Sequence, residues 1–110
     1  MDLISRLSEI KFKTADVPAP ELGDDYVIRV RELSGSEQLT FHSMLSKDNA
    51  NEIKALAYAL MCALVDENGQ RQLKTQDEAE SVVKLLPGKL FQRINKAIFE
   101  LNNGDAEKKL

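Results

Sequence analysis

The sequence contains one cysteine, one histidine and no tryptophan among its 110 residues, and these scarcities exclude several classes of protein. Cys62 has no second cysteine with which to form a disulfide or bind zinc, so neither an oxidising compartment nor a zinc site is indicated. His42 and Cys62 lie in different predicted helices, and a Cys-His nucleophile pair is not expected. Phosphate-binding glycine loops, zinc-protease motifs and EF-hand loops are missing from the sequence. We therefore predict no catalytic residue, no cofactor and no metal, and a protein that is not an enzyme.

The sequence also lacks charge of one predominant sign and long apolar runs. Its 15 basic and 18 acidic residues are mixed along the chain, and the net charge of -3 does not suit a nucleic acid partner. The longest apolar run, 55–65, is well short of the roughly 20 residues that a membrane-spanning helix needs. The first residues lack the basic start and unbroken apolar core of a secretory signal. We expect no nucleic acid or membrane partner, and a reducing cytoplasm as the location.

Four acidic residues lie close together near the N-terminus: Asp16, Glu21, Asp24 and Asp25. Their spacing is not that of a calcium-binding loop. The favoured interpretation is a solvated acidic loop that meets a basic partner, rather than a cation site.

The most informative segment runs from Val17 to Glu37. Pro18 and Pro20 predict a stiff, non-helical loop. Apolar and polar residues then alternate from Tyr26 to Arg31, which predicts a half-buried strand. The alternating segment Ile10–Thr14 is its predicted partner in a two-stranded ribbon. Ser34 and Glu37 have the spacing of a capping box, so a helix is expected to open near Gly35.

The rest of the chain predicts further helices. Apolar residues recur at helical spacing in an amphipathic start, in a helix after Gly35, in a central helix from Ile53 to Leu64, and in two later helices separated by Pro87-Gly88. Asn49 with Glu52 and Thr75 with Glu78 repeat the capping spacing. The segment 70–73 is compatible with an edge strand or a loop. The predicted fold is mainly α, with four to five helices and an N-terminal two-stranded β-ribbon (α+β), as one domain over 1–104 and a flexible tail over 105–110.

Most of the apolar surface of these helices is expected to form the core. The remainder is compatible with a shallow groove for a partner helix, and Met44, Met61 and Phe91 are predicted to line it because their side chains are adaptable. The arginines of the predicted strand, Arg29 and Arg31, either bind an anion or a partner carboxylate or cover apolar surface with their stems.

Several motifs in order along the chain resemble the tail assembly chaperones of long-tailed bacteriophages. They are a Val-Pro pair followed by a turn at Gly23, the strand VIRVREL at 27–33, the segment ALVDENG at 63–69, the helix start at Thr75 to Glu78, and Leu101-Asn102 at the end of the last helix. Leu22 departs from the family pattern, because many members have tryptophan before the glycine. The resemblance covers about 85 residues in order.

The resemblance implies a non-enzymatic chaperone that binds and solubilises the tape measure protein in the host cytoplasm and is absent from the mature virion. It also implies a longer frameshifted form that recruits the tail tube protein. Self-association through open contacts is a further expectation. The alternative is a small phage-encoded regulatory or inhibitory module that binds a protein through the acidic loop. The predicted partner-binding residues are Pro18, Pro20, Leu22, Arg29 and Arg31, and an equally favoured interpretation is that this motif only folds the ribbon.

Overall fold

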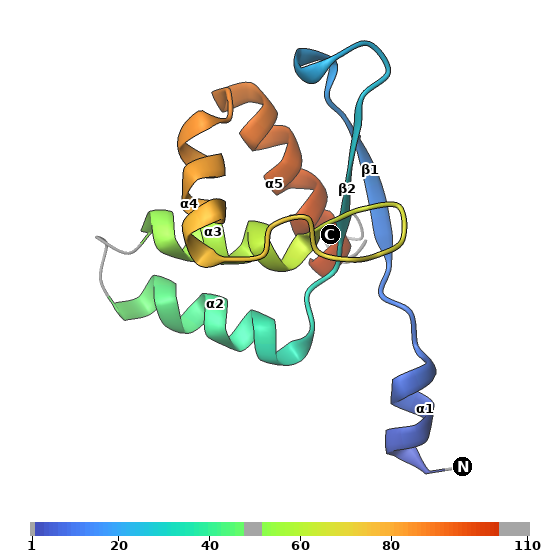
Figure 1. Ribbon diagram of the computed structural model, residues 1–110. Coiled ribbons are helices and arrows are strands. Elements are labelled where there is room, and N and C mark those ends of the chain that lie inside the picture. The colour runs from blue at the N-terminus through green and yellow to red at the C-terminus, as the bar shows by residue number, and fades with distance from the viewer. Residues whose placement is uncertain (1, 48–51, 104–110) are drawn as a thin grey trace, which may run out of the picture.

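The computed structural model describes residues 2–47 and 52–103. Within them, five α-helices and a three-stranded antiparallel sheet confirm a mainly α, α+β fold (Figure 1). The predicted cap at Asn49 and the predicted tail over 105–110 lie outside the described residues. The elements in chain order are α1 (Leu3–Glu9), β1 (Thr14–Pro18), the 3-10 turn η1 (Pro20–Leu22), β2 (Val27–Arg31), α2 (Gly35–Lys47), α3 (Glu52–Ala63), β3 (Leu64–Val65), α4 (Gln76–Leu85) and α5 (Gly88–Asn103).

In the first hairpin, the segment that pairs with β2 is not the predicted one. The predicted partner Ile10–Thr14 was wrong, because β1 begins at Thr14 and pairs as far as Pro18, opposite Val27. Burial explains the shift: Val17 is 2% exposed, whereas Ile10 is 61% exposed. Pro18 is tolerated in this position because β1 is an edge strand and the proline is its last residue.

The ribbon is also larger than predicted, because a third strand joins it. α3 ends at Ala63, and Leu64 and Val65 pair antiparallel with Val30 and Arg29 of β2. The sequence hides this change because Leu64 continues the helical spacing of the preceding residues. Within the segment that the sequence left open, Arg71 makes an isolated bridge to Val65 rather than a longer strand.

Two predicted helix starts are confirmed as capping boxes. At the start of α2, the backbone N–H of Glu37 donates to Ser34 Oγ at 3.2 Å, and Ser34 N–H donates back to Glu37 Oε1 at 2.8 Å. Thr75 and Glu78 form the same reciprocal pair at the start of α4. Each box satisfies backbone donors that the first helical turn leaves without partners.

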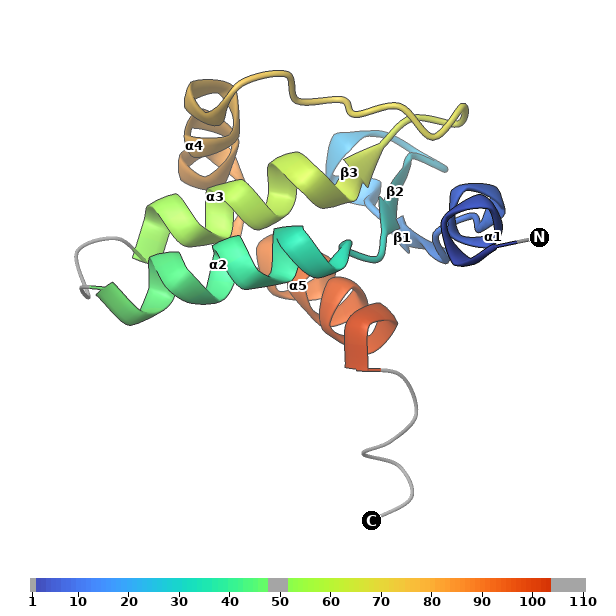
Figure 2. The ribbon, with the colours of Figure 1, turned by 90° about the horizontal axis from the view of Figure 1, so that it is seen from below.

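The core lies where α3 and α5 meet the inner face of the sheet. α3 packs against both α2 and α4, and its buried alanines, Ala55, Ala57, Ala59 and Ala63, allow these helices to approach closely. α5 packs against β1 and β2 instead (Figure 2). Because α5 packs on the sheet and α2 packs on α3, helices α2, α3 and α5 leave a space between them.

Candidate functional site

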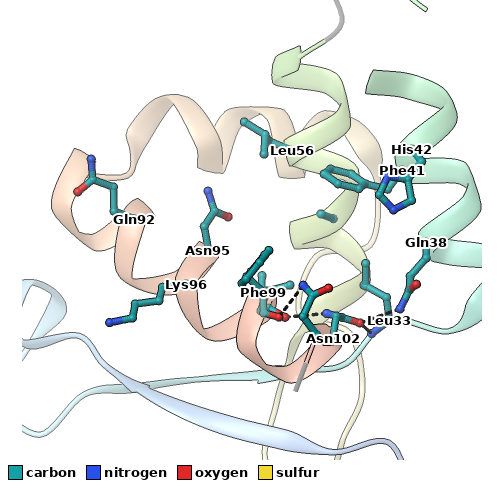
Figure 3. Close-up of a pocket in the computed structure, with 13 residues that line it drawn as sticks. Leu33, Gln38, Phe41, His42, Leu56, Gln92, Asn95, Lys96, Phe99 and Asn102 are labelled. Carbon is teal, nitrogen blue, oxygen red and sulfur yellow. Dashed lines mark hydrogen bonds between the residues drawn. The ribbon is translucent and has the colours of Figure 1, made fainter. Parts of the chain in front are cut away.

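A groove of about 650 Å³ lies between α2, α3 and α5 (Figure 3). Its volume is in the range that small-molecule pockets usually have. Thirteen residues line it: Leu33, Gln38, Phe41, His42, Leu56, Ala59, Gln92, Asn95, Lys96, Ile98, Phe99, Asn102 and Asn103.

Apolar side chains from three helices form the floor of the groove. Phe41 comes from α2, Leu56 from α3 and Phe99 from α5. Phe99 is 49% exposed, although a phenylalanine ring gains free energy when it leaves water. The rings of Phe41 and His42 lie 5.6 Å apart in a tilted arrangement. The floor is therefore apolar surface that the described chain does not cover.

The rim of the groove is polar but almost uncharged. Five of the thirteen lining residues are amides, which can donate and accept hydrogen bonds in many directions. Lys96 is the lining lysine, and none of the thirteen lining residues is an aspartate or a glutamate. In a chain with 18 acidic residues, this freedom from carboxylates makes the groove neutral to slightly positive.

Asn102 fixes one end of the groove. Its Oδ1 accepts the backbone N–H of Leu33 at 2.9 Å and the side-chain N–H of Gln38 at 3.1 Å. Its Nδ2 donates to the carbonyl of Ile98 at 2.7 Å. These bonds link the last turn of α5 to the entry to α2.

A second network holds the start of α2. Both terminal nitrogens of Arg31 donate to the carboxylate of Glu37, at 3.1 and 2.8 Å, and Arg71 Nη2 donates to the same carboxylate at 2.8 Å. Burial acts to raise the pKa of Glu37, but the hydrogen bonds from Arg31, from the backbone of Ser34 and from Arg71 outweigh it and hold the pKa at about 2. Glu37 is therefore ionised at neutral pH.

The structure gives each predicted arginine a partner within the chain. Arg29 Nε donates to Asp16 Oδ1 at 3.1 Å. Arg31 pairs with Glu37, and its guanidinium also lies 4.7 Å above the centre of the Phe12 ring. The interpretation that this motif folds the ribbon therefore has a physical basis, and a role for the two arginines in partner binding stays a prediction.

The predicted prolines lie at the tip of the hairpin. The carbonyl of Pro18 accepts from Arg93 Nη1 at 2.8 Å, and Pro20 begins η1. Arg93 also donates through both terminal nitrogens to Glu21, at 3.1 and 2.9 Å, which ties the tip to α5. This contact with Arg93 lowers the pKa of the Glu21 carboxyl.

Leu22, the fifth predicted residue, borders a second and smaller cleft. This cleft of about 260 Å³ lies between the hairpin tip and the end of α4, and Tyr26 and Leu85 line it as well. Leu22 is 52% exposed and Leu85 is 81% exposed. The hairpin tip therefore contributes a second apolar surface, separate from the groove.

The groups with catalytic potential do not meet. Cys62 is fully buried in α3, and burial raises the pKa of its thiol. His42 is exposed at the groove. In residues 2–47 and 52–103, no three histidine, cysteine or acidic side chains are grouped closely enough to hold a metal ion. In the same ranges, no helix has both the length and the apolar character to cross a membrane.

The prediction of which residues line a groove was wrong. None of Met44, Met61 and Phe91 lines the observed groove. The signal that could have located it is Phe99, a large aromatic residue outside the apolar stripe of the last helix. The amide side chains gave no signal, because amides are common on exposed helix faces.

Comparison with known proteins gives a match among solved structures. No protein-family model and no curated protein matches this chain. Among solved structures, it is similar to the bacteriophage HK97 tail assembly chaperone, with a TM-score of 0.64 and 21% sequence identity over 90% of this chain and 97% of that one. The predicted resemblance is confirmed at the level of the fold: this chain has the fold of a bacteriophage tail assembly chaperone.

Proposed function

We propose that this chain is a tail assembly chaperone of a long-tailed bacteriophage or prophage, which acts by binding protein and not by catalysis. The observation that carries the proposal is the open apolar groove on a fold shared with a solved tail assembly chaperone. The partner that we propose for the groove is an amphipathic helix of the tape measure protein.

The groove suits a helix for three reasons. Its apolar floor accepts the apolar stripe of an amphipathic helix. Its amide rim offers hydrogen bonds to polar side chains at the edges of that stripe without demanding a fixed charge pattern. Twelve of its thirteen lining residues also lie in helices α2, α3 and α5, so the partner meets a preformed surface and little order has to be created on binding.

A tape measure protein poses a problem that such a groove solves. A very long, mainly helical chain exposes apolar stripes that would associate with one another before the tail tube encloses them. Many copies of a small protein, each bound weakly, can cover these stripes and later be displaced. We extend the proposal to recruitment of the tail tube protein by a longer frameshifted form, to the host cytoplasm as location, and to absence from the mature virion.

The regulatory alternative receives less support from the described residues. It relies on a free acidic loop, but Asp16 pairs with Arg29 and Glu21 pairs with Arg93. Two of the four acidic side chains are therefore engaged within the chain.

The decisive experiment is co-expression with the tape measure-like product of the neighbouring gene. We expect the wild-type chain to raise the soluble fraction of that product and to co-elute with it in several copies. Phe99→Ser removes an exposed ring from the groove floor, and we expect it to reduce both effects. Leu39→Ser is the matched control, because Leu39 is 73% exposed on α2 and does not line the groove.

The possible outcomes separate the function from the site. If the wild-type chain leaves the partner insoluble and nothing co-elutes, the chaperone proposal fails. If the wild-type chain and Phe99→Ser act alike while Leu22→Ser or Leu85→Ser loses activity, the function stands and the binding surface is the hairpin cleft instead.

A further inference from the structure

The hairpin cleft, between the tip of the β1–β2 hairpin and the end of α4, has exposed apolar side chains on both of its sides. Leu22 and Tyr26 of the hairpin tip are 52% and 47% exposed, and Leu85 of α4 is 81% exposed. None of the eleven lining residues carries a charge. The others are Ile28, Leu64, Gln72, Leu73, Val82, Leu86, Pro87 and Ile94. Large apolar side chains gathered around one cleft indicate a contact surface.

The two sides of the cleft are held in place before any partner arrives. Arg93 of α5 binds the hairpin tip through the carboxylate of Glu21 and the carbonyl of Pro18. Within the tip, the backbone N–H of Tyr26 donates to the carbonyl of Gly23 at 3.0 Å. The tip is therefore tied to α5 and closed on itself, and little order has to be created on binding.

The size of the cleft indicates what it can hold. Its volume of about 260 Å³ lies below the roughly 300–1,000 Å³ of pockets for small molecules and cofactors. A small apolar cleft at the surface suits one bulky side chain of a partner protein instead. Such a side chain is the kind of anchor that contributes most of the free energy at many protein interfaces.

The charges around the cleft differ between its two sides. Asp24 and Asp25 are exposed at the hairpin tip, next to Tyr26. Lys84 and Lys89 are exposed at the corner between α4 and α5. Among residues 2–47 and 52–103, none of these four side chains forms an ion pair. A partner segment gains most when its basic side chains lie toward the tip and not toward the two lysines.

We propose that the hairpin cleft is a second protein-binding site. Its occupant is a segment of another protein in which a bulky apolar side chain has lysine or arginine a few positions away. The apolar side chain lies between Leu22 and Leu85, and its basic neighbours meet Asp24 and Asp25. An anionic lipid surface or a nucleic acid does not suit this site, because its phosphates would be repelled by the two carboxylates of the tip.

The inference does not rest on the proposed function. The cleft and the groove have no lining residue in common, so one chain can hold a segment at each site. Because a single apolar anchor covers little area, the contact is weak. The exposed carboxylates mainly select the sign of the partner's charge, and salt should reduce that selection by screening.

The experiment is an NMR titration of the ¹⁵N-labelled chain with two synthetic peptides. Both contain two adjacent leucines between glycine-serine spacers, followed by two lysines in one peptide and by two glutamates in the other. We expect the basic peptide to shift the amide signals of Leu22, Leu73 and Leu85 saturably. It should bind about tenfold more tightly than the acidic peptide at low salt, and less selectively at high salt.

Variants separate the apolar contact from the charge. Leu22→Ser and Leu85→Ser, one from each side of the cleft, should each weaken both peptides about fivefold or more. Asp24→Asn with Asp25→Asn should weaken the basic peptide alone, and asparagine tolerates the φ of +64° at position 25. The matched control is Glu9→Gln with Glu100→Gln, which removes two exposed carboxylates that line neither cavity and should leave both affinities unchanged.

The outcomes test the cleft apart from the groove. Phe99→Ser should bind the basic peptide like the wild type, whatever its effect on the tape measure-like product. Shifts at Phe99 instead of Leu22, or no saturable shift at all, would overturn the proposal. Equal weakening in the control variant would reduce the effect to the acidity of the whole chain. A wild-type mass that rises with concentration and falls in Leu22→Ser would assign the cleft to a second copy and overturn the proposal as well.

Discussion

Asn102 Oδ1 accepts the backbone N–H of Leu33 at 2.9 Å, across 69 positions of the sequence. Leu33 is 8% exposed, so water has little access to its backbone N–H, which needs an acceptor within the protein. The same oxygen accepts from Gln38, and one amide thus connects the end of β2, the start of α2 and the end of α5. The bond lies at one end of the groove.

Replacement of Asn102 by alanine should destabilise the fold. It removes the acceptor for Leu33 and Gln38 together, and we expect a loss of about 2 kcal/mol in the free energy of unfolding. Urea denaturation followed by circular dichroism measures this loss. Asn103→Ala is the matched control, because the exposed Asn103 donates to the carbonyl of Phe99 within its own helix and, among the described residues, makes no bond to α2. Equal losses in the two variants would show that the bonds of Asn102 to α2 carry no special weight.

Acid should weaken the fold through Glu37. Its pKa is about 2 in the folded chain and near 4.5 ordinarily, so the unfolded state takes up the proton first as pH falls. The stability that the carboxylate provides is complete above about pH 4.5 and is lost as pH falls from there toward 2. We expect this carboxylate to account for about 2 kcal/mol of the loss, allowing for the exposure of Arg71.

Glu37→Gln isolates this effect. The variant should be less stable than the wild type at pH 7, because Arg31 and Arg71 lose their charged partner. The difference should shrink as pH falls through the same window, since the wild-type carboxyl becomes neutral as well. Stability curves for the two proteins that stay parallel down to pH 2 would contradict the assigned pKa.

The elements that the sequence predicted well are those with strong local signals. The capping boxes at Ser34 and Thr75 are matched side chains three positions apart, and local chemistry decides them. The buried stripe of α5, with Leu90, Ile94 and Ile98, follows from helical spacing alone. These features need no knowledge of distant parts of the chain.

The errors lie where a tertiary contact overrides a local pattern. Ile10 and Phe12 alternate as in a strand, yet β1 starts later because Val17 is the residue that the helical core buries. Leu64 fits the spacing of a helix, yet it pairs with Val30 of β2. In both cases the deciding partner is distant in sequence, so periodicity cannot reveal it.

The motifs behind the family resemblance have mostly structural roles. Val30 is fully buried, Leu33 and Asn102 are hydrogen-bonded to each other, and Thr75 caps α4. The groove floor at Phe99 lies outside those motifs. The sequence could therefore indicate the fold while giving little information about the surface that binds.

The thiol of Cys62 should be unreactive in the folded chain. The residue has no exposed surface, and burial raises the pKa of its thiol, so little reactive thiolate forms at neutral pH. We expect Ellman's reagent to modify it at least about a thousandfold more slowly in buffer than in urea, because reaction requires unfolding. Ser43→Cys in a Cys62→Ala background is the exposed control on α2 and should react at once. Rapid modification of native Cys62 would mean that α3 opens locally.

Two glycines should respond in opposite directions to alanine. Gly69 has a φ of +81°, which alanine adopts only with strain, although no atom lies within 4 Å of the added Cβ. Gly88 begins α5 at a negative φ with open space around it, so alanine there restricts the unfolded chain at little cost.

We therefore expect Gly69→Ala to lower the free energy of unfolding by about 1 kcal/mol and Gly88→Ala to raise it by about 0.5 kcal/mol. Thermal unfolding should show Tm moving down in the first variant and up in the second, and the double variant should show the sum, because the sites share no partner. The turn at Gly69 joins β3 to the Arg71 bridge, and its Asp66 accepts the N–H groups of Asn68 and Gln70. If Gly69→Ala leaves the free energy of unfolding unchanged, this turn is not held in its positive-φ form. The position of β3 then depends on its pairing with β2 and not on the turn.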